Sequence, residues 1–287
     1  GPSHPKKYSR TWRRCFSVSK GLRTGRKISW CPGCGNFGIL AATIKALEEL
    51  NLDPEKVVLV SGIGCHGRIT DYIRANSIHG IHGRVLPLAT GIKLANHELT
   101  VIGFAGDGDA YNIGIGHLPA AARRNIDITY IVHNNMVYGL TTGQASPTSP
   151  LGFKSRSTPL GNIEKPLNPI LFAIACGATF VARGFAGEVE HLKNLIVEAI
   201  RHEGFALIDV LQPCITFNPT ISQQLRKRIY KLEENGHNPR DKNQAIKKAQ
   251  EWENKIPIGI IYKEERPTYH KQIPQLTQKP LTKHKQT

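Results

Sequence analysis

Apolar residues follow two patterns along this chain, short continuous runs and stretches with helical periodicity. The continuous runs predict buried strands, and they are residues 56–61, 99–105, 127–132 and 205–211. The periodic stretches predict helices at residues 37–50, 70–75, 118–124, 169–177 and 188–202. Because strands and helices alternate, the sequence predicts the α/β class, with a doubly wound parallel sheet.

Candidate ligands follow the ends of the predicted strands. Cys65 follows the first strand, residues 106–109 the second, Asn135 the third and Cys214 the last. In open parallel sheets, ligands bind along the edge formed by the carboxyl ends of the strands. Sulfur and oxygen ligands that are distant in sequence should therefore share one edge of the sheet.

From about residue 223 the chain becomes charged and polar. Helices are predicted at 225–235 and 242–255, followed by an apolar stretch at 256–262 and an irregular arm at 263–287. We therefore expect the chain to consist of three parts. They are a basic N-terminal extension (1–27), an α/β domain that carries the ligands (28–222) and a charged C-terminal extension, helical and then irregular (223–287).

The net charge of +16 is concentrated in the two extensions, which makes both of them basic, while the middle of the chain is close to neutral. This distribution favours solvated tails or an acidic partner over nucleic acid, so no nucleic-acid partner is expected. No apolar run reaches the roughly 18–20 residues of a membrane span, so no membrane association is expected either. The acid-free start also fits a transit peptide, but a cytoplasmic extension is favoured, and the expected location is the cytoplasm.

Four of the six cysteines lie beside Gly or Pro in predicted loops, namely Cys31, Cys34, Cys65 and Cys214. Cys176 lies in an apolar run and Cys15 in the basic tail, and such unequal surroundings argue against a disulfide framework. Four loop thiolates suit either an iron–sulfur cluster or a zinc ion. Because two of the four stand singly in distant loops, a cluster is favoured, while structural zinc remains open.

Oxygen ligands are grouped in two other loops. Gly106-Asp107-Gly108-Asp109 follows a predicted strand and precedes a helix, and Asn134-Asn135 follows the next strand. Carboxylate and amide oxygens near a helix start suit Mg²⁺ bound to a diphosphate. Taken alone, Gly-Asp-Gly is also an ordinary turn, and the two asparagines can simply end a strand.

Together with residues 121–125 and 137–148, these motifs resemble the β subunits of 2-oxoacid:ferredoxin oxidoreductases, and the resemblance extends over roughly residues 28–262. It implies a sheet of the thiamine diphosphate-binding type, with Mg²⁺ on Asp107, Asn135 and the carbonyl of Val137. It also implies a [4Fe–4S] cluster on the four loop cysteines. The residues expected to line the cofactor site are Gly64, Cys65, Gly106, Asp107, Gly108, Asp109, Asn135, Val137, Tyr138, Gly139 and Leu140.

Three residues are candidates for the substrate side. Arg68 offers the two-pronged geometry that a substrate carboxylate needs, although a surface ion pair is an equal alternative. The family often has Lys at this position and another at Thr142, so its substrate preference does not transfer. His82 and Arg84 are expected either to orient cofactor or substrate or to pack.

The resemblance implies oxidative decarboxylation of a 2-oxoacid, such as 2-oxoglutarate or pyruvate. Coenzyme A takes the acyl group, CO₂ leaves, and electrons pass through the cluster to ferredoxin. No Glu lies in a motif that would activate the aminopyrimidine of thiamine diphosphate, so an α (or fused αγ) subunit is expected to supply that carboxylate. Two alternatives remain, a non-redox thiamine diphosphate decarboxylase subunit and a zinc-stabilised basic nucleic-acid-binding protein.

Overall fold

An eight-stranded sheet runs through the computed structural model, which describes residues 21–277 and 279–283. Residues 1–20, which include Cys15 and most of the expected N-terminal extension, lie outside the described residues. The strands are β1 (Val57–Ser61), β2 (Asn76–His79), β3 (Thr100–Gly106), β4 (Ile128–Asn134), β5 (Phe180–Phe185), β6 (Phe205–Leu211), β7 (Ile229–Lys231) and β8 (Ile256–Lys263). Their order is β2-β1-β3-β4-β6-β5-β8-β7, and the first six are parallel.

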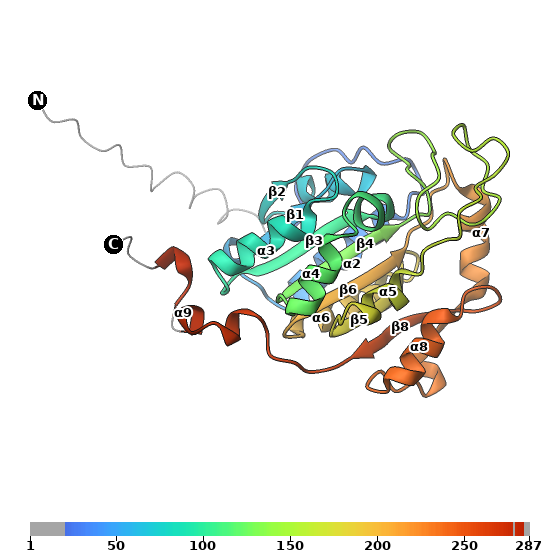
Figure 1. Cartoon of the computed structure of the whole chain (residues 1–287). Coiled ribbons are helices and arrows are strands. Elements are labelled where there is room, and N and C mark those ends of the chain that lie inside the picture. The colour runs from blue at the N-terminus through green and yellow to red at the C-terminus, as the bar shows by residue number, and fades with distance from the viewer. Residues whose placement is uncertain (1–20, 278, 284–287) are drawn as a thin grey trace, which may run out of the picture.

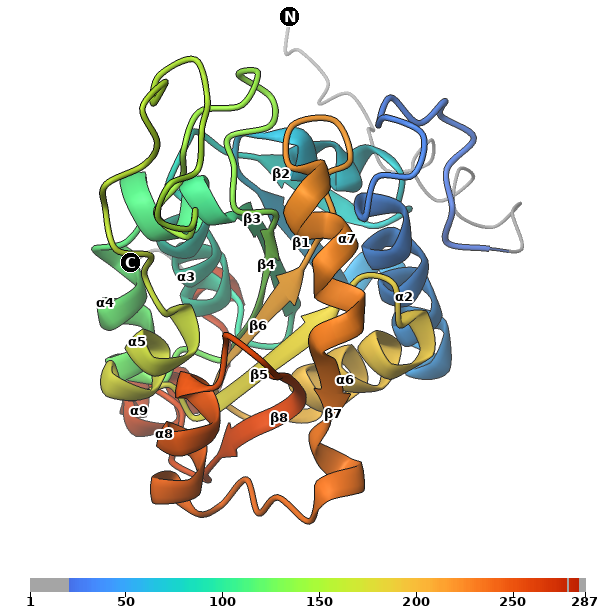
Figure 2. The ribbon, with the colours of Figure 1, turned by 90° about the vertical axis from the view of Figure 1, so that its right-hand side faces the viewer.

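Helices cover both faces of this sheet. On one face α2 (Asn36–Glu49) packs beside α6 (Val189–Arg201). The other face carries α3 (Val85–Ala95), α4 (His117–Arg124), α5 (Pro169–Ala175) and α8 (Lys242–Gln250). Figures 1 and 2 show the strands between these two layers. In Figure 1, α7 (Pro219–Arg228) stands at the right, beside the ends to which the strands point, and α9 (Pro274–Thr277) lies at the left, near the opposite ends. The predicted doubly wound α/β fold is confirmed.

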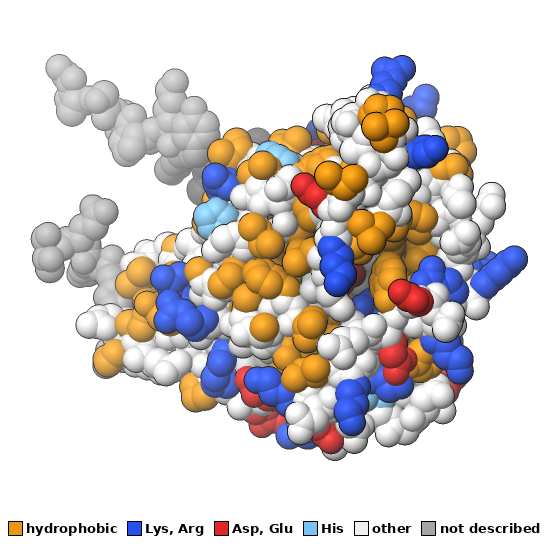
Figure 3. Space-filling model, turned by 45° about the vertical axis from the view of Figure 1, so that its right-hand side comes forward, with side chains coloured by type: hydrophobic (Ala, Val, Ile, Leu, Met, Phe, Trp, Pro, Cys, Tyr) orange, Lys and Arg blue, Asp and Glu red, His pale blue; other side chains and the backbone are white. Residues whose placement is uncertain are grey.

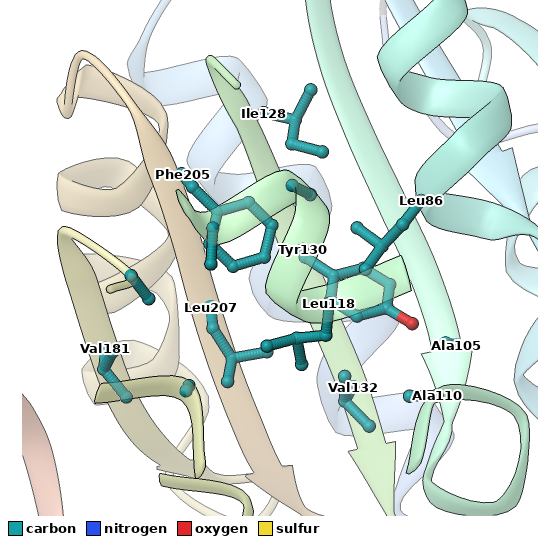
Figure 4. Packing of buried hydrophobic residues seen from close by; sticks show 14 of the residues in the cluster. Leu86, Ala105, Ala110, Leu118, Ile128, Tyr130, Val132, Val181, Phe205 and Leu207 are labelled. Carbon is teal, nitrogen blue, oxygen red and sulfur yellow. The ribbon is translucent and has the colours of Figure 1, made fainter. Parts of the chain in front are cut away.

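The central strands are buried on both faces, which explains why they appear in the sequence as continuous apolar runs. In β4, Ile128, Tyr130 and Val132 belong to one core, whereas Ile131 belongs to the core on the opposite face. Figure 4 shows Tyr130 packed with Leu118 of α4 and its neighbours. Alternate residues of each strand therefore join the two helix layers to the sheet.

The four predicted strands are confirmed, as are the helices near residues 37–50, 118–124, 169–177 and 188–202. The helix predicted at 70–75 is wrong, because residues 65–71 form tight 3₁₀ turns and the chain then becomes irregular. The turns and the residues directly after them place three apolar side chains in the core, Ile69, Tyr72 and Ile73. Their spacing in the sequence resembled that of a helix for this reason.

The C-terminal segment contributes to the main sheet. Strand β8 pairs antiparallel with β5 and parallel with β7. The last two strands of the sheet therefore run opposite to the first six. The helix predicted at 225–235 is wrong beyond Arg228, where α7 ends and β7 begins. The helix expected at 242–255 is present as α8 but ends earlier, at Gln250.

The predicted extended arm is fixed to the body by a few buried side chains. Thr268, His270 and Leu276 are buried, although the chain around them forms only short helical turns. Such isolated anchors give no regular hydrophobic period, which is why the sequence pattern indicated little packing there.

Candidate functional site

Two adjoining cavities lie at the carboxyl ends of β1, β3, β4 and β6. The first has a volume of about 590 Å³ and the second about 440 Å³. Residues that line both cavities are Ile63, Gly64, Cys65, Asn135, Gly139, Leu140 and Gln212. The predicted oxygen and sulfur ligands thus lie along one edge of the sheet, where ligands of open parallel sheets bind.

Asp107 lies at the base of the first cavity, directly after β3, and only 2% of it is exposed. Its Oδ2 accepts a hydrogen bond of 2.8 Å from the hydroxyl of Thr148. Burial raises the pKa of Asp107 to about 6, while hydrogen bonds from Ser146 and Thr148 act in the opposite direction. A cation beside this carboxylate would favour its ionised form.

The loop after β4 brings Asn135 and Val137 to the same cavity. The amide oxygen of Asn135 accepts a hydrogen bond of 3.1 Å from the backbone N–H of Val137. Between them, Met136 has a φ of 58°, a left-handed conformation that is unusual for a residue other than glycine. The loop is therefore held in a specific, locally unfavourable shape.

Tyr138 holds the turn that carries Asp107. Its hydroxyl donates to the carbonyl of Gly108 at 3.2 Å and accepts from the side chain of Asn112 at 2.8 Å. A Cβ at Gly108 would lie 2.2 Å from the tyrosine ring, so this close approach requires glycine. The predicted cofactor residues Gly106, Gly108, Asp109, Tyr138, Gly139 and Leu140 all line the first cavity.

Asp109 contacts two histidines, of which the sequence indicated only one. Its Oδ1 lies 2.9 Å from Nδ1 of His82 and accepts a 2.6 Å hydrogen bond from the N–H of Gly83. Its Oδ2 lies 3.3 Å from Nε2 of His66. Both histidines line the first cavity. Since Nδ1 of His82 faces Asp109, Nε2 is the nitrogen left for a group that enters the cavity.

The four predicted cluster cysteines line the second cavity together. A Cβ built at Gly139 would lie 3.7 Å from Sγ of Cys65 and 3.9 Å from Sγ of Cys214, so both sulfurs face this backbone. Burial, helped by the three other cysteines and opposed by a backbone hydrogen bond at Asn36, raises the pKa of the Cys34 thiol to about 12. An unliganded thiolate is therefore strongly disfavoured here.

Hydrogen bonds join the loops that carry these distant cysteines. The indole N–H of Trp30 donates to the carbonyl of Cys65 at 2.7 Å, and the N–H of Gly35 donates to the carbonyl of Pro213 at 3.0 Å. Among the described residues, no three or more His, Cys, Asp or Glu side chains are grouped closely enough to hold a single metal ion. Cys176, which caps the C-terminal end of α5, lies apart and packs, partly buried, against the core.

Arg68 and Arg84 occupy different surroundings. Arg68 lines the second cavity, and its Nε lies 3.1 Å from a carboxylate oxygen of Asp71. Arg84 donates to the backbone carbonyls of Gly83 and Ile113 at 3.2 and 3.4 Å.

The sequence did not indicate His66, His133 and Gln212 as cavity residues, although His66 directly follows a predicted ligand.

The surface shows no single concentration of basic side chains on the face drawn in Figure 3. Lys and Arg are scattered across the visible described residues, with acidic side chains among them. None of the helices in the described part of the chain combines the length and the hydropathy needed to cross a membrane.

Two family models match most of the chain. The model for the C-terminal TPP-binding domain of thiamine pyrophosphate enzymes matches residues 62–210. The model for the C-terminal part of the pyruvate ferredoxin oxidoreductase beta subunit matches residues 214–278. The second match begins at Cys214, the fourth cysteine of the second cavity.

Curated proteins and solved structures show the same similarity. The 2-oxoacid:ferredoxin oxidoreductase subunit beta of Saccharolobus solfataricus is 54% identical over 249 residues, which cover 82% of each chain. The 2-oxoglutarate synthase subunit KorB of Archaeoglobus fulgidus is 46% identical over 200 residues, 70% of this chain and 74% of that one. A 2-oxoglutarate:ferredoxin oxidoreductase from Magnetococcus marinus, solved with 2-oxoglutarate, coenzyme A and succinyl-CoA bound, matches with a TM-score of 0.84. It is 39% identical and covers 86% of this chain and 85% of that one.

Proposed function

Because the chain belongs to the β subunits of 2-oxoacid:ferredoxin oxidoreductases, we propose that it carries the cofactor and cluster half of such an enzyme. The reaction is oxidative decarboxylation of a 2-oxoacid with coenzyme A, which yields acyl-CoA and CO₂. The observation that carries this proposal is the pair of adjoining cavities, one lined by hard oxygen ligands and the other by four thiols.

The first cavity suits thiamine diphosphate with Mg²⁺. Its volume lies within the range of cofactor pockets, and Asp107, Asn135 and the carbonyl of Val137 offer the oxygen ligands that Mg²⁺ prefers. When bound, thiamine diphosphate supplies an electron sink for the carbon that loses CO₂. His82, held through Nδ1 by Asp109, offers Nε2 to hold or transfer a proton at the reacting group.

The second cavity suits a [4Fe–4S] cluster better than zinc. A zinc ion needs four ligands within about 2.3 Å, whereas a cluster spreads its four thiolates around a larger body. The four cysteines surround a cavity of about 440 Å³, and no described group of such side chains is close enough for one ion. This spacing also disfavours the zinc-stabilised nucleic-acid-binding alternative.

The shared lining would bring the electron source and the cluster close together. Gly139 and Asn135 line both cavities, and Cys31 is exposed at the outer side of the second. Electrons would thus enter the cluster from the first cavity and leave toward a carrier at the surface, for which we propose ferredoxin. We place the reaction in the cytoplasm, where reducing conditions keep cysteines available as ligands.

An α (or fused αγ) subunit would complete the active site. Exposed apolar side chains stand around the first cavity, among them Ile63, Ile113 and Leu140, with Ile81 beside His82. Such a group of exposed apolar residues is typical of an interface. The partner would supply the carboxylate for the aminopyrimidine. Arg68, which lines the second cavity, would have to give up its contact with Asp71 to bind the carboxylate of a substrate such as 2-oxoglutarate or pyruvate.

Metal analysis tests this function directly. Protein purified without oxygen should contain iron and sulfide in equal amounts with little zinc, and should show a brown colour that bleaches on reduction. A non-redox thiamine diphosphate decarboxylase subunit would bind the cofactor without iron. Zinc in place of iron and sulfide would contradict the proposal.

A further inference from the structure

We propose that Thr148 and Ser149 are positioning residues that hold the two sides of the Mg²⁺-diphosphate site. The inference rests on the proposed function, because it concerns the geometry of Asp107 and Val137 as ligands. Residues 146–149 form a hydroxyl turn, which lies beneath the first cavity and contacts both ligand loops. Sequence motifs gave this turn no role of its own.

Thr148 fixes the carboxylate of Asp107. Its hydroxyl lies 2.8 Å from Oδ2 of Asp107 and 2.9 Å from the amide oxygen of Asn134. A hydroxyl has one hydrogen to donate, and an ionised carboxylate is the stronger acceptor. This hydrogen bond to Oδ2 fixes the orientation of the Asp107 carboxylate at the first cavity.

The orientation of Asn134 is itself fixed from the far side. Its amide nitrogen donates to both carboxylate oxygens of buried Asp209 at 3.1 and 3.2 Å, and Tyr111 donates to the same group at 2.8 Å. The amide oxygen of Asn134 must therefore face Thr148. Thr148 is thus held between two fixed groups and cannot rotate freely.

Ser149 fixes the other ligand loop. Its hydroxyl donates to the carbonyl of Met136 at 2.6 Å and accepts from the N–H of Ser146 at 2.8 Å. Met136 has the left-handed backbone that precedes Val137, and such a conformation persists only when its surroundings enforce it. The hydrogen bond to the Met136 carbonyl holds the peptide unit between Met136 and Val137. It thereby helps to set the direction of the next peptide unit, which carries the Val137 oxygen.

The hydroxyl turn is anchored well enough to serve as a support. Asn162 donates to the carbonyl of Ser149 at 3.2 Å, and the N–H of Leu167 donates to the carbonyl of Pro147 at 2.8 Å. Ser146, Thr148 and Ser149 are all buried. Buried hydroxyls are costly unless they are bonded, and in this turn Thr148 and Ser149 each bond a ligand loop.

The test measures Mg²⁺ binding by the full chain assembled with its partner subunit, at saturating thiamine diphosphate, by calorimetry. Thr148→Val, which removes the hydroxyl at nearly constant volume, should weaken Mg²⁺ binding by about 10–100-fold, the usual effect of losing a partner of a metal ligand. Thr148→Ser should restore most of the affinity. Ser149→Ala should weaken binding in the same direction.

A matched control comes from the same long segment. Thr158 donates to the carbonyl of Phe153 at 3.0 Å and bonds Ser155 within the same loop, so Thr158→Val should leave Mg²⁺ affinity unchanged. In turnover, Thr148→Val should raise the apparent KM for the metal-bound cofactor more than it lowers kcat at saturation. This pattern separates positioning from general loss of structure.

The outcomes are distinguishable. If the wild-type complex binds no thiamine diphosphate with Mg²⁺, the proposed function fails and the positioning role with it. If the wild type binds and Thr148→Val binds equally well, only the positioning role is overturned. If Thr148→Val does not fold, Thr148→Ser and Ser149→Ala carry the test, and unchanged Mg²⁺ affinity in Ser149→Ala overturns the inference.

Discussion

Asp107 and Asp109 stand two positions apart in one turn and meet different partners. Asp107 is held by hydroxyls beneath the first cavity, whereas Asp109 contacts two imidazoles and a backbone N–H. Hydroxyls that donate to Asp107 favour its ionised form, the form that binds a hard cation, whereas both oxygens of Asp109 face imidazoles. We therefore propose that Asp107 binds the metal and that Asp109 orients His82.

Asp107→Ala should abolish binding of thiamine diphosphate with Mg²⁺ while leaving the iron–sulfur absorbance intact. The carboxylate is a hard ligand for Mg²⁺ and takes no part in sulfur coordination. Calorimetry measures the first effect and visible absorbance the second. Cofactor affinity like that of the wild type would remove Asp107 from the site.

Cys214→Ser should lower iron and sulfide content and stop electron transfer to ferredoxin. Its sulfur faces the second cavity beside Gly139, and replacing a thiolate ligand weakens the cluster. Cys176→Ser is the matched control, because Cys176 packs against a helix layer away from both cavities. Equal loss of iron from the two variants would show that the fourth ligand is wrongly chosen.

Much of this site was accessible from sequence because it depends on local position. A ligand directly after an apolar strand lies at the carboxyl edge whatever the details of packing, which placed Cys65, Asp107, Asn135 and Cys214 correctly at the two cavities. His66 and Thr148 were missed as contributors since their partners are 43 and 41 residues away. Side-chain pairs of this kind leave no periodic signal.

At the scale of elements, the hydrophobic pattern identified four of the buried strands, but it missed β5, which is buried throughout although Arg183 and Gly184 interrupt its apolar run. It failed for β2, whose four residues are exposed and therefore give no apolar run. It also failed for α3, which carries Pro87 in its first turn, a position that a helix tolerates but that weakens the sequence signal. The strand β8 was visible as an apolar stretch, but its pairing with β5 depends on tertiary contacts.

The junction of α6, β5 and β6 contains a pH-sensitive contact. Nε2 of His202 lies 2.8 Å from the hydroxyl of Thr179, and burial lowers the pKa of His202 from 6.5 to about 4, with the charge of Lys263 acting in the same direction. Between these values the unfolded chain binds more protons than the folded one. Stability therefore rises with pH through this window and is lost as pH falls from 6.5 toward 4.

His202→Gln should flatten this dependence, because glutamine can bond Thr179 but does not titrate. Melting temperatures of wild type and variant, measured from about pH 7 to about pH 4.5, should converge or cross as the pH falls. Parallel curves would show that His202 does not contribute to the acid sensitivity of the fold.

At the scale of the whole molecule, one edge of the sheet carries two sets of candidate ligands. The oxygen ligands line one cavity and the four thiols line the other. The first cavity offers oxygen ligands for the Mg²⁺ of a diphosphate cofactor, the second offers thiols for a one-electron carrier, and seven residues line both. Exposed apolar residues around the first cavity leave surface for other proteins. The molecule is thus suited to act as one half of a larger enzyme.

The most direct test follows the colour of the cluster in anaerobic protein supplied with thiamine diphosphate and Mg²⁺. With the partner subunit present, adding a 2-oxoacid and coenzyme A should bleach the iron–sulfur absorbance, and ferredoxin should restore it. The isolated chain should show no bleaching under the same conditions. Bleaching by the chain alone would contradict the shared active site, and a loaded complex that no 2-oxoacid bleaches would contradict the account as a whole.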